Sequence, residues 1–249
     1  MNACAALTIF AVNYISASCY FVYVSLKSKQ LLAFSTQEGV MSNSILGEKV
    51  VSAENPVQDY LDIMKEITYE RASSEAVAEK AWRRFMDWIS KTDFFSAPAS
   101  TRFHGSFAGG LVEHHLDVYN ETVDLLKLPK FEKVNANSAY LVALVHDFCK
   151  IGLYDPYFRN VKNDVTGKWE QVQAFKYDKP QYPFGHGVTS MYIANQFFRL
   201  SRDEALAIRW HMGEYNCCEN EMSDLQEARD RSPLVLLLQT ADRMSITAY

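Results

Sequence analysis

The spacing of apolar residues predicts a chain built mainly from helices. In most segments apolar residues recur every three or four positions, which is the period of an α-helix that buries one face. Several segments follow a capping signal, such as Asn55 before Pro56, and Ser201 with Glu204 forms a capping box. The predicted helices begin after Asn55, Ser74, Gly110, Asn135 or Asn137, Gly187, Ser201 and Ser232.

The stretch 154–182 departs from this helical period and is rich in aromatic and polar residues. A turn-forming segment from Asn163 to Gly167 separates two aromatic and apolar runs, which predicts a β-hairpin. We expect this hairpin to be an insertion that lies across the mouth of the helical domain. Its aromatic residues either pack onto that domain or offer a stacking surface for a nucleobase.

The N-terminal residues 1–26 are apolar and almost uncharged. A signal peptide carries positive charge before its apolar core, and this segment has none there. Interspersed tyrosine, serine and asparagine residues also make the run less apolar than a typical membrane span. Because Met41 opens a more ordinary polar stretch, we expect translation to begin there, with a signal anchor at 1–26 as the alternative.

We therefore predict one folded domain preceded by an extension that is not part of the fold. The extension covers 1–48 and the domain covers 49–249. The predicted parts of the domain are a helical lead-in at 55–98, a motif core at 100–245 and the hairpin insertion at 154–182.

Composition narrows the class of protein. The net charge of −5 gives no global basic field for non-specific binding of nucleic acid, although a local basic groove stays compatible with it. The five cysteines include no Cys-x-x-Cys pair, which argues against a disulfide framework and against a structural zinc knuckle. We expect a cytoplasmic protein without stable membrane association.

The strongest chemical signal is the apolar run from Leu141 to Val145, which ends abruptly in His146 and Asp147. A carboxylate at the end of a buried segment is costly unless a positive group meets it. A divalent metal ion is one such partner, because imidazole nitrogen and carboxylate oxygen are ordinary ligands for these ions. The alternative is a core histidine beside an aspartate that backbone groups satisfy.

Further residues of ligand type lie on other predicted helices. The chain has six histidines, and all of them follow residue 100. Helices that each present one or two such residues can converge on a metal site inside a bundle. Helical periodicity alone places His115 nearer to the buried stripe of its helix than His114. The candidate ligands are His114 or His115, His146, Asp147, His186, His211 and Asp242.

The order of these residues resembles that of the HD-domain metal-dependent phosphohydrolases. The segment His146–Gly152 is similar to their His-Asp-x-Gly-Lys-Ile-Gly signature, with Cys149 where the family usually has glycine. Gly109–His114 resembles the Gly-Gly-Leu-Leu-Glu-His segment of the bacterial 3′–5′ exoribonuclease branch. The resemblance covers roughly residues 100–245 and implies an all-α HD-domain helical bundle with a small β-hairpin insertion.

The resemblance also implies a ligand set, with His114 rather than His115 as the first ligand. It suggests two divalent ions, among which Mn, Fe, Mg and Ni are not distinguished. Asp147 would bridge them, and the alternative for His186 or His211 is direct contact with phosphate. One ion would be completed by His114, His146 and Asp242, and the other by His186 and His211.

Three further residues are candidates for contacts with substrate. Lys150 follows Asp147 by three positions and either holds a phosphate as a point charge or is a solvated lysine at a helix end. Arg102 and His104, in the loop before His114, are expected to meet phosphate or base. We assign Asp147 and Lys150 to catalysis.

The predicted function is hydrolysis of a phosphate ester or anhydride in a nucleotide or a nucleic-acid end by a metal-activated water. One alternative is 3′–5′ exoribonuclease-like activity on single strands. The other is a non-enzymatic regulatory module that binds a nucleotide through the same fold. A cyclic dinucleotide substrate is less favoured because the Gly-Tyr-Pro motif of that branch is absent. The sequence leaves the oligomeric state open.

Overall fold

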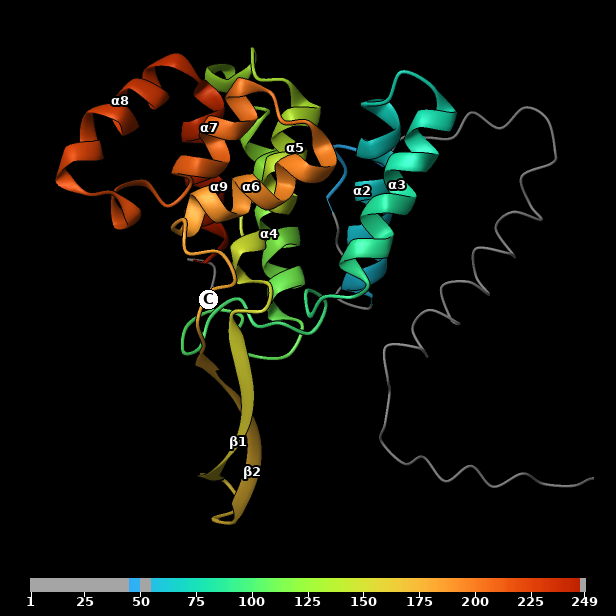
Figure 1. Ribbon diagram of the computed structural model, residues 1–249. Helices are drawn as coiled ribbons and strands as arrows, with labels where there is room; N and C mark the ends of the chain where they lie inside the picture. Colours follow the sequence, from blue (N-terminus) through green and yellow to red (C-terminus); the bar gives the residue numbers. More distant parts are fainter. Residues whose placement is uncertain (1–44, 50–54, 247–249) are drawn as a thin grey trace, which may run out of the picture. The chain divides into compact units, whose positions relative to one another are not determined.

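The computed structural model describes residues 45–49 and 55–246, and within them the fold is mostly helical (Figure 1). This confirms the predicted all-α class with one small hairpin. The expectations for residues 1–26 and for Met41 lie outside the described residues. The α-helices of the described part are α2 (Pro56–Glu70), α3 (Glu75–Ile89), α4 (Gly110–Leu125), α5 (Ala136–Val145), α6 (His186–Phe198), α7 (Arg202–Trp210), α8 (Met222–Arg231) and α9 (Pro233–Ser245).

Most helices begin where the capping residues predict. The side chain of Asn55 accepts a hydrogen bond from the amide of Gln58 at the start of α2, and Ser74 does the same for α3. Asn135, rather than Asn137, caps α5. The capping box before α7 is present in full. The pattern did not predict α8, because that helix is short and highly charged and buries only Leu225 and Ala228.

Helix α5 lies at the centre of the packing. It contacts α2, α4, α7 and α9, and each residue from Leu141 to Val145 is 0% exposed. Such a helix, apolar on all sides, is stable only when other elements cover every face. Its C-terminal end therefore lies deep in the bundle, where neighbouring helices can reach it.

The hairpin consists of β1 (Tyr154–Lys162) and β2 (Trp169–Tyr177), paired antiparallel from Tyr154 opposite Tyr177 to Lys162 opposite Trp169. The side chain of Asn163 accepts hydrogen bonds from two amides of the turn. Of the strand residues only Phe175 is buried. The strands accordingly extend away from the helices (Figure 1).

Residues 45–49 lie against the bundle. The amide of Gly47 donates a 3.0 Å hydrogen bond to the hydroxyl of Tyr119 on α4, and Lys49 pairs with Asp124 on the same helix. The packed unit therefore includes the end of the segment 1–48, which the sequence analysis placed outside the fold. Within the described residues, none of the helices combines the length and the apolar character needed to cross a membrane.

A buried ion pair joins α2 to α7. The guanidinium of Arg71 donates two hydrogen bonds, of 2.5 and 3.0 Å, to the carboxylate of Glu204, whose side chain is 1% exposed. The same guanidinium donates to the carbonyl of Phe198 at the end of α6. Glu204 is also the acceptor in the capping box of α7, so its carboxylate links the end of α2 to the start of α7, while Arg71 adds the end of α6.

We expect Arg71→Met to lower the free energy of unfolding by about 3–5 kcal/mol, because it leaves a buried carboxylate unpaired. The matched control is Arg83→Met, which removes an exposed pair with Glu79 and should cost less than about 0.5 kcal/mol. Denaturant unfolding at neutral pH measures both values. An equal cost for the two variants would contradict a structural role of the buried pair.

The same pair predicts a pH dependence. Burial alone would raise the pKa of Glu204, but Arg71 and the cap hydrogen bonds hold it below its usual value. A depressed carboxylate pKa contributes stability above the unfolded value, and this contribution is lost as the pH falls through the folded one. The difference between wild type and Arg71→Met should therefore shrink below about pH 4.

Candidate metal centre

The centre of the site is Asp147, which directly follows the buried end of α5. His146 is the C-cap of α5, and Asp147 leaves the helical conformation with φ −108° and ψ 22°. A 3₁₀ turn over Phe148–Lys150 follows. This turn brings the ammonium of Lys150 back to within 2.7 Å of Asp147 Oδ2. Lys150 is therefore not a solvated lysine at a helix end, since its side chain is only 12% exposed.

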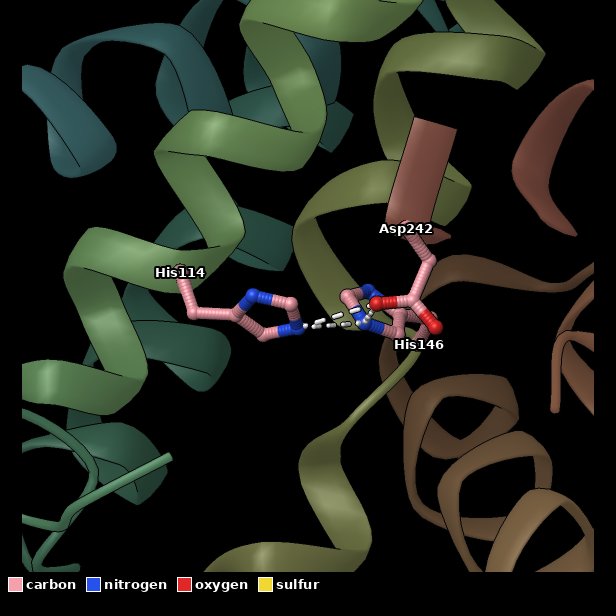
Figure 2. Close-up of side chains that lie close together, drawn as sticks. All are labelled: His114, His146 and Asp242. Atoms are coloured by element: carbon pink, nitrogen blue, oxygen red, sulfur yellow. Dashed lines mark hydrogen bonds and ion pairs between the residues drawn. The ribbon is translucent and has the colours of Figure 1, made fainter. Parts of the chain in front are cut away.

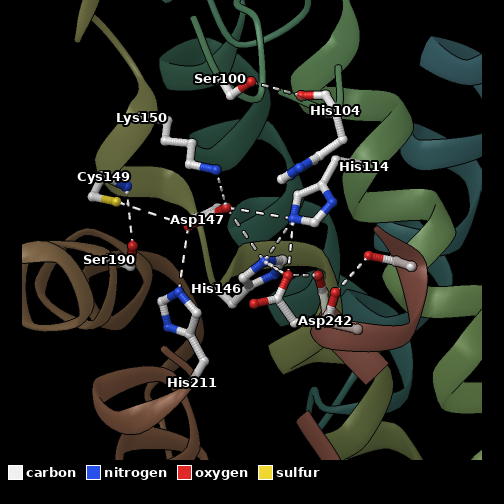
Figure 3. A network of polar contacts seen from close by, with 12 residues as sticks. Ser100, His104, His114, His146, Asp147, Cys149, Lys150, Ser190, His211 and Asp242 are labelled. Atoms are coloured by element: carbon white, nitrogen blue, oxygen red, sulfur yellow. Dashed lines mark hydrogen bonds and ion pairs between the residues drawn. The ribbon is translucent and has the colours of Figure 1, made fainter. Parts of the chain in front are cut away.

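The structure brings together all six ligand candidates favoured by the resemblance. Figure 3 labels five of them, and the sixth, His186, lies 2.7 Å from Asp147 Oδ1. His114 comes from α4 and Asp242 from α9, and His114 Nε2 lies 3.3 Å from Asp242 Oδ1. The same nitrogen lies 3.3 Å from His146 Nε2. Two imidazole nitrogens and a carboxylate oxygen thus point toward one another in Figure 2.

The two oxygens of Asp147 face different groups. Oδ1 lies 2.7 Å from His186 Nε2 and 3.4 Å from His211 Nε2. Oδ2 lies 3.5 Å from His114 Nε2 and also 3.5 Å from His146 Nε2. One carboxylate therefore separates the histidines into two pairs, one on each of its oxygens.

Backbone carbonyls fix the tautomers of two histidines. His146 Nδ1 lies 2.9 Å from the carbonyl of Ala143, and His211 Nδ1 lies 2.7 Å from the carbonyl of Ile208. Because a carbonyl only accepts, each Nδ1 carries a proton, and each ring is held with Nε2 toward Asp147. Carbonyl-oriented imidazoles of this kind are typical of metal ligands.

One of these two Nε2 atoms has no hydrogen-bond partner among the described residues. His211 Nε2 is buried and makes no hydrogen bond to any described residue, because its 3.4 Å contact with Asp147 lacks hydrogen-bond geometry. A buried polar atom without a partner costs free energy that a bound cation would remove. The donor set also fits a divalent ion, because it offers converging imidazole nitrogens and ionised carboxylates.

Close approaches of backbone make this convergence possible. A Cβ at Gly187 would lie 2.1 Å from the carbonyl oxygen of Arg209, so only glycine lets the start of α6 meet the end of α7. The rings of His186 and His211 are consequently 5.1 Å apart between centroids. A Cβ at Gly110 would likewise clash with the backbone of Gly105. That glycine allows the preceding loop to pack onto α4.

The charges of the site keep both carboxylates ionised. Burial alone would raise the pKa of Asp147, but Lys150, His146 and His186 hold it well below its usual value. The pKa of Asp242 is also lowered, because its hydrogen bond with His114 and nearby histidines outweigh burial. Burial opposes protonation of His114, yet its contacts with both carboxylates raise its pKa. Burial lowers the pKa of His146.

His114 and His115 are both buried, on different sides of α4. His114 faces the carboxylates, whereas His115 packs among core rings such as Phe94 and Phe148. Its ring also lies 5.0 Å from that of His146, without facing either carboxylate. Neither ring nitrogen of His115 has a hydrogen-bond partner among the described residues. Burial and the neighbouring histidines hold its pKa well below the usual value, so this ring is neutral.

An open cavity of about 410 Å³ lies over the cluster. Of the hairpin, only Tyr154 lines it, so the expected position of the insertion across the mouth is wrong. Apart from Phe175, which is buried, most of the remaining strand residues are exposed. His104 lines the cavity, whereas Arg102 is exposed and does not.

His104 is held in place by the loop before α4. Its carbonyl accepts a 2.8 Å hydrogen bond from the hydroxyl of Ser100, and its ring lies 5.0 Å from that of His114. Burial, together with the charges of His114 and Lys150, lowers the pKa of His104 to about 4. A neutral imidazole, able to donate and accept one hydrogen bond each, therefore faces the cavity at neutral pH.

The sequence analysis missed the opposite wall of the cavity. Arg229, Gln239 and Arg243 line it, and Gln239 Oε1 accepts a 2.9 Å hydrogen bond from Arg229 Nε. Gln239 also donates to the carbonyl of Trp210. The position of Gln239, three residues before Asp242 on one helix, was a usable signal. Arg229 had none, because its helix was not predicted.

Comparisons with protein-family models, curated proteins and solved structures give no match. The family resemblance therefore rests on the motifs alone. In the structure, histidine, aspartate and cysteine side chains lie close enough together to bind a metal ion. Three sets each place their ligand atoms within 4.8 Å: His114, His146 and Asp242; His146, Asp147 and His211; and Asp147, Cys149 and His186.

Adjacent histidines give a matched test of metal binding. We expect His114→Leu to weaken Mn²⁺ binding by about 100-fold or more, because it removes a nitrogen that faces both carboxylates. His115→Leu should bind Mn²⁺ as wild type does. It should also be at least as stable, because two buried nitrogens without partners are replaced by apolar atoms. Calorimetric titration and denaturant unfolding measure the two effects.

The reverse outcome would overturn the assignment. If His115→Leu lost Mn²⁺ and His114→Leu retained it, the ligand would be the core-facing histidine. Equal loss in both variants, with wild-type stability, would mean that the two side chains act together.

Proposed function

We propose that this chain is a divalent-metal-dependent phosphohydrolase that cleaves a phosphate ester or anhydride of a nucleotide or of a nucleic-acid end. The observation that carries the proposal is the division of histidines between the two oxygens of Asp147. A carboxylate with nitrogen ligands gathered at each oxygen is suited to hold two cations side by side. The order of these residues, which resembles the HD-domain enzymes, supports the same conclusion.

The residues would be shared as follows. Asp147 would contribute one oxygen to each of two ions. His114, His146 and Asp242 would complete one ion, while His186 and His211 would complete the other. When bound, such ions neutralise phosphate oxygens and increase the acidity of a water molecule. Mn²⁺, Fe²⁺, Mg²⁺ and Ni²⁺ all suit mixed nitrogen and oxygen ligands.

The chain itself supplies the remaining interactions with a phosphate. Burial opposes a charged Lys150, but Asp147 raises its pKa, so the ammonium is positive at the cavity floor. It lies beside the carboxylate and can hold a phosphate oxygen as a point charge. Neutral His104 can donate a hydrogen bond at the mouth. Arg229 also lines the cavity, but its guanidinium is paired with Glu214 at 2.6 Å, so Lys150 is the cation on which this proposal depends.

Hydrolysis of bis-nitrophenyl phosphate with added Mn²⁺ tests the proposal. Asp147→Asn keeps the side-chain volume but removes the charge shared by both histidine pairs. We expect its turnover to fall by about 100-fold or more. The control is His115→Leu, a change of the adjacent buried histidine that does not face the carboxylates, and it should retain turnover. Equal activity of Asp147→Asn and wild type would show that the site is wrongly assigned.

An inactive wild type that still binds Mn²⁺ would favour the non-enzymatic regulatory alternative. That result would have to hold for the monoester and for the other candidate metals.

A second candidate function is hydrolysis of single-stranded nucleic acid, which the arrangement of aromatic residues on the hairpin favours. The strand register places Tyr154, Phe158, Trp169, Phe175 and Tyr177 on one face, because directly paired residues and alternate positions share a face. No carboxylate lies on that face, whereas Asp155 and Glu170 lie on the other. The aromatic face starts at Tyr154 in the cavity wall and continues outward, and aromatic rings of this kind stack on successive bases.

Paired surface variants separate this candidate from mononucleotide hydrolysis. Phe158→Ser with Trp169→Ser should weaken binding of a short oligonucleotide by about 10-fold or more, since each stacked base contributes about 1–3 kcal/mol. The control is Tyr157→Ser with Val161→Ser on the opposite face, where we expect no change. Fluorescence anisotropy measures binding. Equal affinities in both double variants would favour a mononucleotide substrate.

A further inference from the structure

His186 differs from the other histidines of the site in what holds its second nitrogen. His146 and His211 use Nδ1 to donate to backbone carbonyls. His186 Nδ1 instead lies 3.3 Å from the sulfur of Cys149, while its Nε2 lies 2.7 Å from Asp147 Oδ1. Cys149 is the position at which the motif departs from the glycine of the resembling family.

The thiol of Cys149 lies beside two polar side chains. Its sulfur is 3.3 Å from His186 Nδ1 and 4.0 Å from Asp147 Oδ1, to which it can donate its proton. Imidazole nitrogen, carboxylate oxygen and cysteine sulfur are all ordinary zinc ligands. The three side chains each offer one such atom within 4.8 Å of the others.

The separation of the Cys149 sulfur from His186 Nδ1 suits two ligands of one tetrahedral ion. With a Zn–S bond of about 2.3 Å and a Zn–N bond of about 2.0 Å, tetrahedral ligand atoms lie about 3.5 Å apart. The observed 3.3 Å between sulfur and nitrogen is close to that value. The backbone around Cys149 is fixed, because its amide donates a 3.0 Å hydrogen bond to Ser190. His186, which lines the cavity with 24% side-chain exposure, provides access from solvent.

We propose that Cys149, His186 and Asp147 form a site for a soft divalent cation such as Zn²⁺ or Cd²⁺. Binding replaces the S–H bond with a metal–sulfur bond and releases the proton to solvent. Thiolate ligands select soft ions, whereas Mn²⁺ prefers oxygen and nitrogen. Occupation of the site engages His186 and Asp147 Oδ1. Soft cations therefore inhibit the hydrolysis, an effect that rests on the proposed function, whereas the binding of the cation does not.

Titration with Co²⁺ tests the site without any enzymatic assay, because a thiolate ligand gives a charge-transfer absorption in the near ultraviolet. The comparison uses wild type, Cys149→Ser, and a variant in which serine replaces Cys4, Cys19, Cys217 and Cys218. We expect the band in wild type and in the fourfold variant, and its loss in Cys149→Ser. A band that persists in Cys149→Ser and disappears in the fourfold variant would assign it to other cysteines. Absence of the band from all three proteins would also overturn the proposal.

Inhibition is measured separately, as the Cd²⁺ concentration that halves Mn²⁺-dependent hydrolysis, each protein being compared with its own uninhibited rate. We expect Cys149→Ser to need at least about 10-fold more Cd²⁺, since loss of one ligand weakens binding by that order. Unchanged sensitivity would remove the inhibitory role even if Co²⁺ binds. If wild type hydrolyses nothing, the proposed function fails, while the Co²⁺ absorption still decides the site.

Discussion

The structure depends on the burial of one carboxylate at the end of one apolar helix. Asp147 is 2% exposed and follows five residues that are fully buried. Removing an isolated carboxylate from water costs several kcal/mol even after relaxation, so the surrounding groups must compensate for it. Here Lys150 and the histidines from four other positions do so, and these groups come from α4, α6, α7 and the end of α5 itself. The central position of α5 makes that convergence possible, because its end is within reach of helices on several sides.

Local signals allowed much of the fold to be predicted. Asn55, Ser74 and the Ser201–Glu204 box each mark a helix start by a hydrogen bond between neighbours in sequence, so their effect is visible without the fold. The hairpin was predictable for the same reason, through its turn. Helix α8 was not, since its stability comes from packing against α9 rather than from a strong apolar stripe. The direction of the hairpin also depends on contacts that periodicity does not describe.

The candidate site was predictable as a set of residues but not as a geometry. Periodicity correctly indicates that His115 is buried, yet burial and function are separate properties here, because α4 has core on one side and the carboxylate cluster on the other. A rotation of about 100° between adjacent residues is enough to separate the two environments. The motif distinguished them where the helical angle could not. Arg229 escaped prediction because only the packing of α8 against α9 brings its side chain to Gln239 at the cavity, whereas the spacing of Gln239 from Asp242 was a signal that went unused.

The histidines of the site differ in what holds their second nitrogen. His146 and His211 are oriented by carbonyls of their own helices, which stay in place as long as the helices are intact. His186 lies at the first residue of α6 and is oriented by a side-chain thiol instead. A sulfur can move between rotamers and exchange its proton, whereas a helical carbonyl can do neither. The Oδ1 side of Asp147 therefore combines a histidine held by a carbonyl, His211, with one that faces a thiol, His186. Cys149, at the position where the resembling family has glycine, thus touches the orientation of a single histidine.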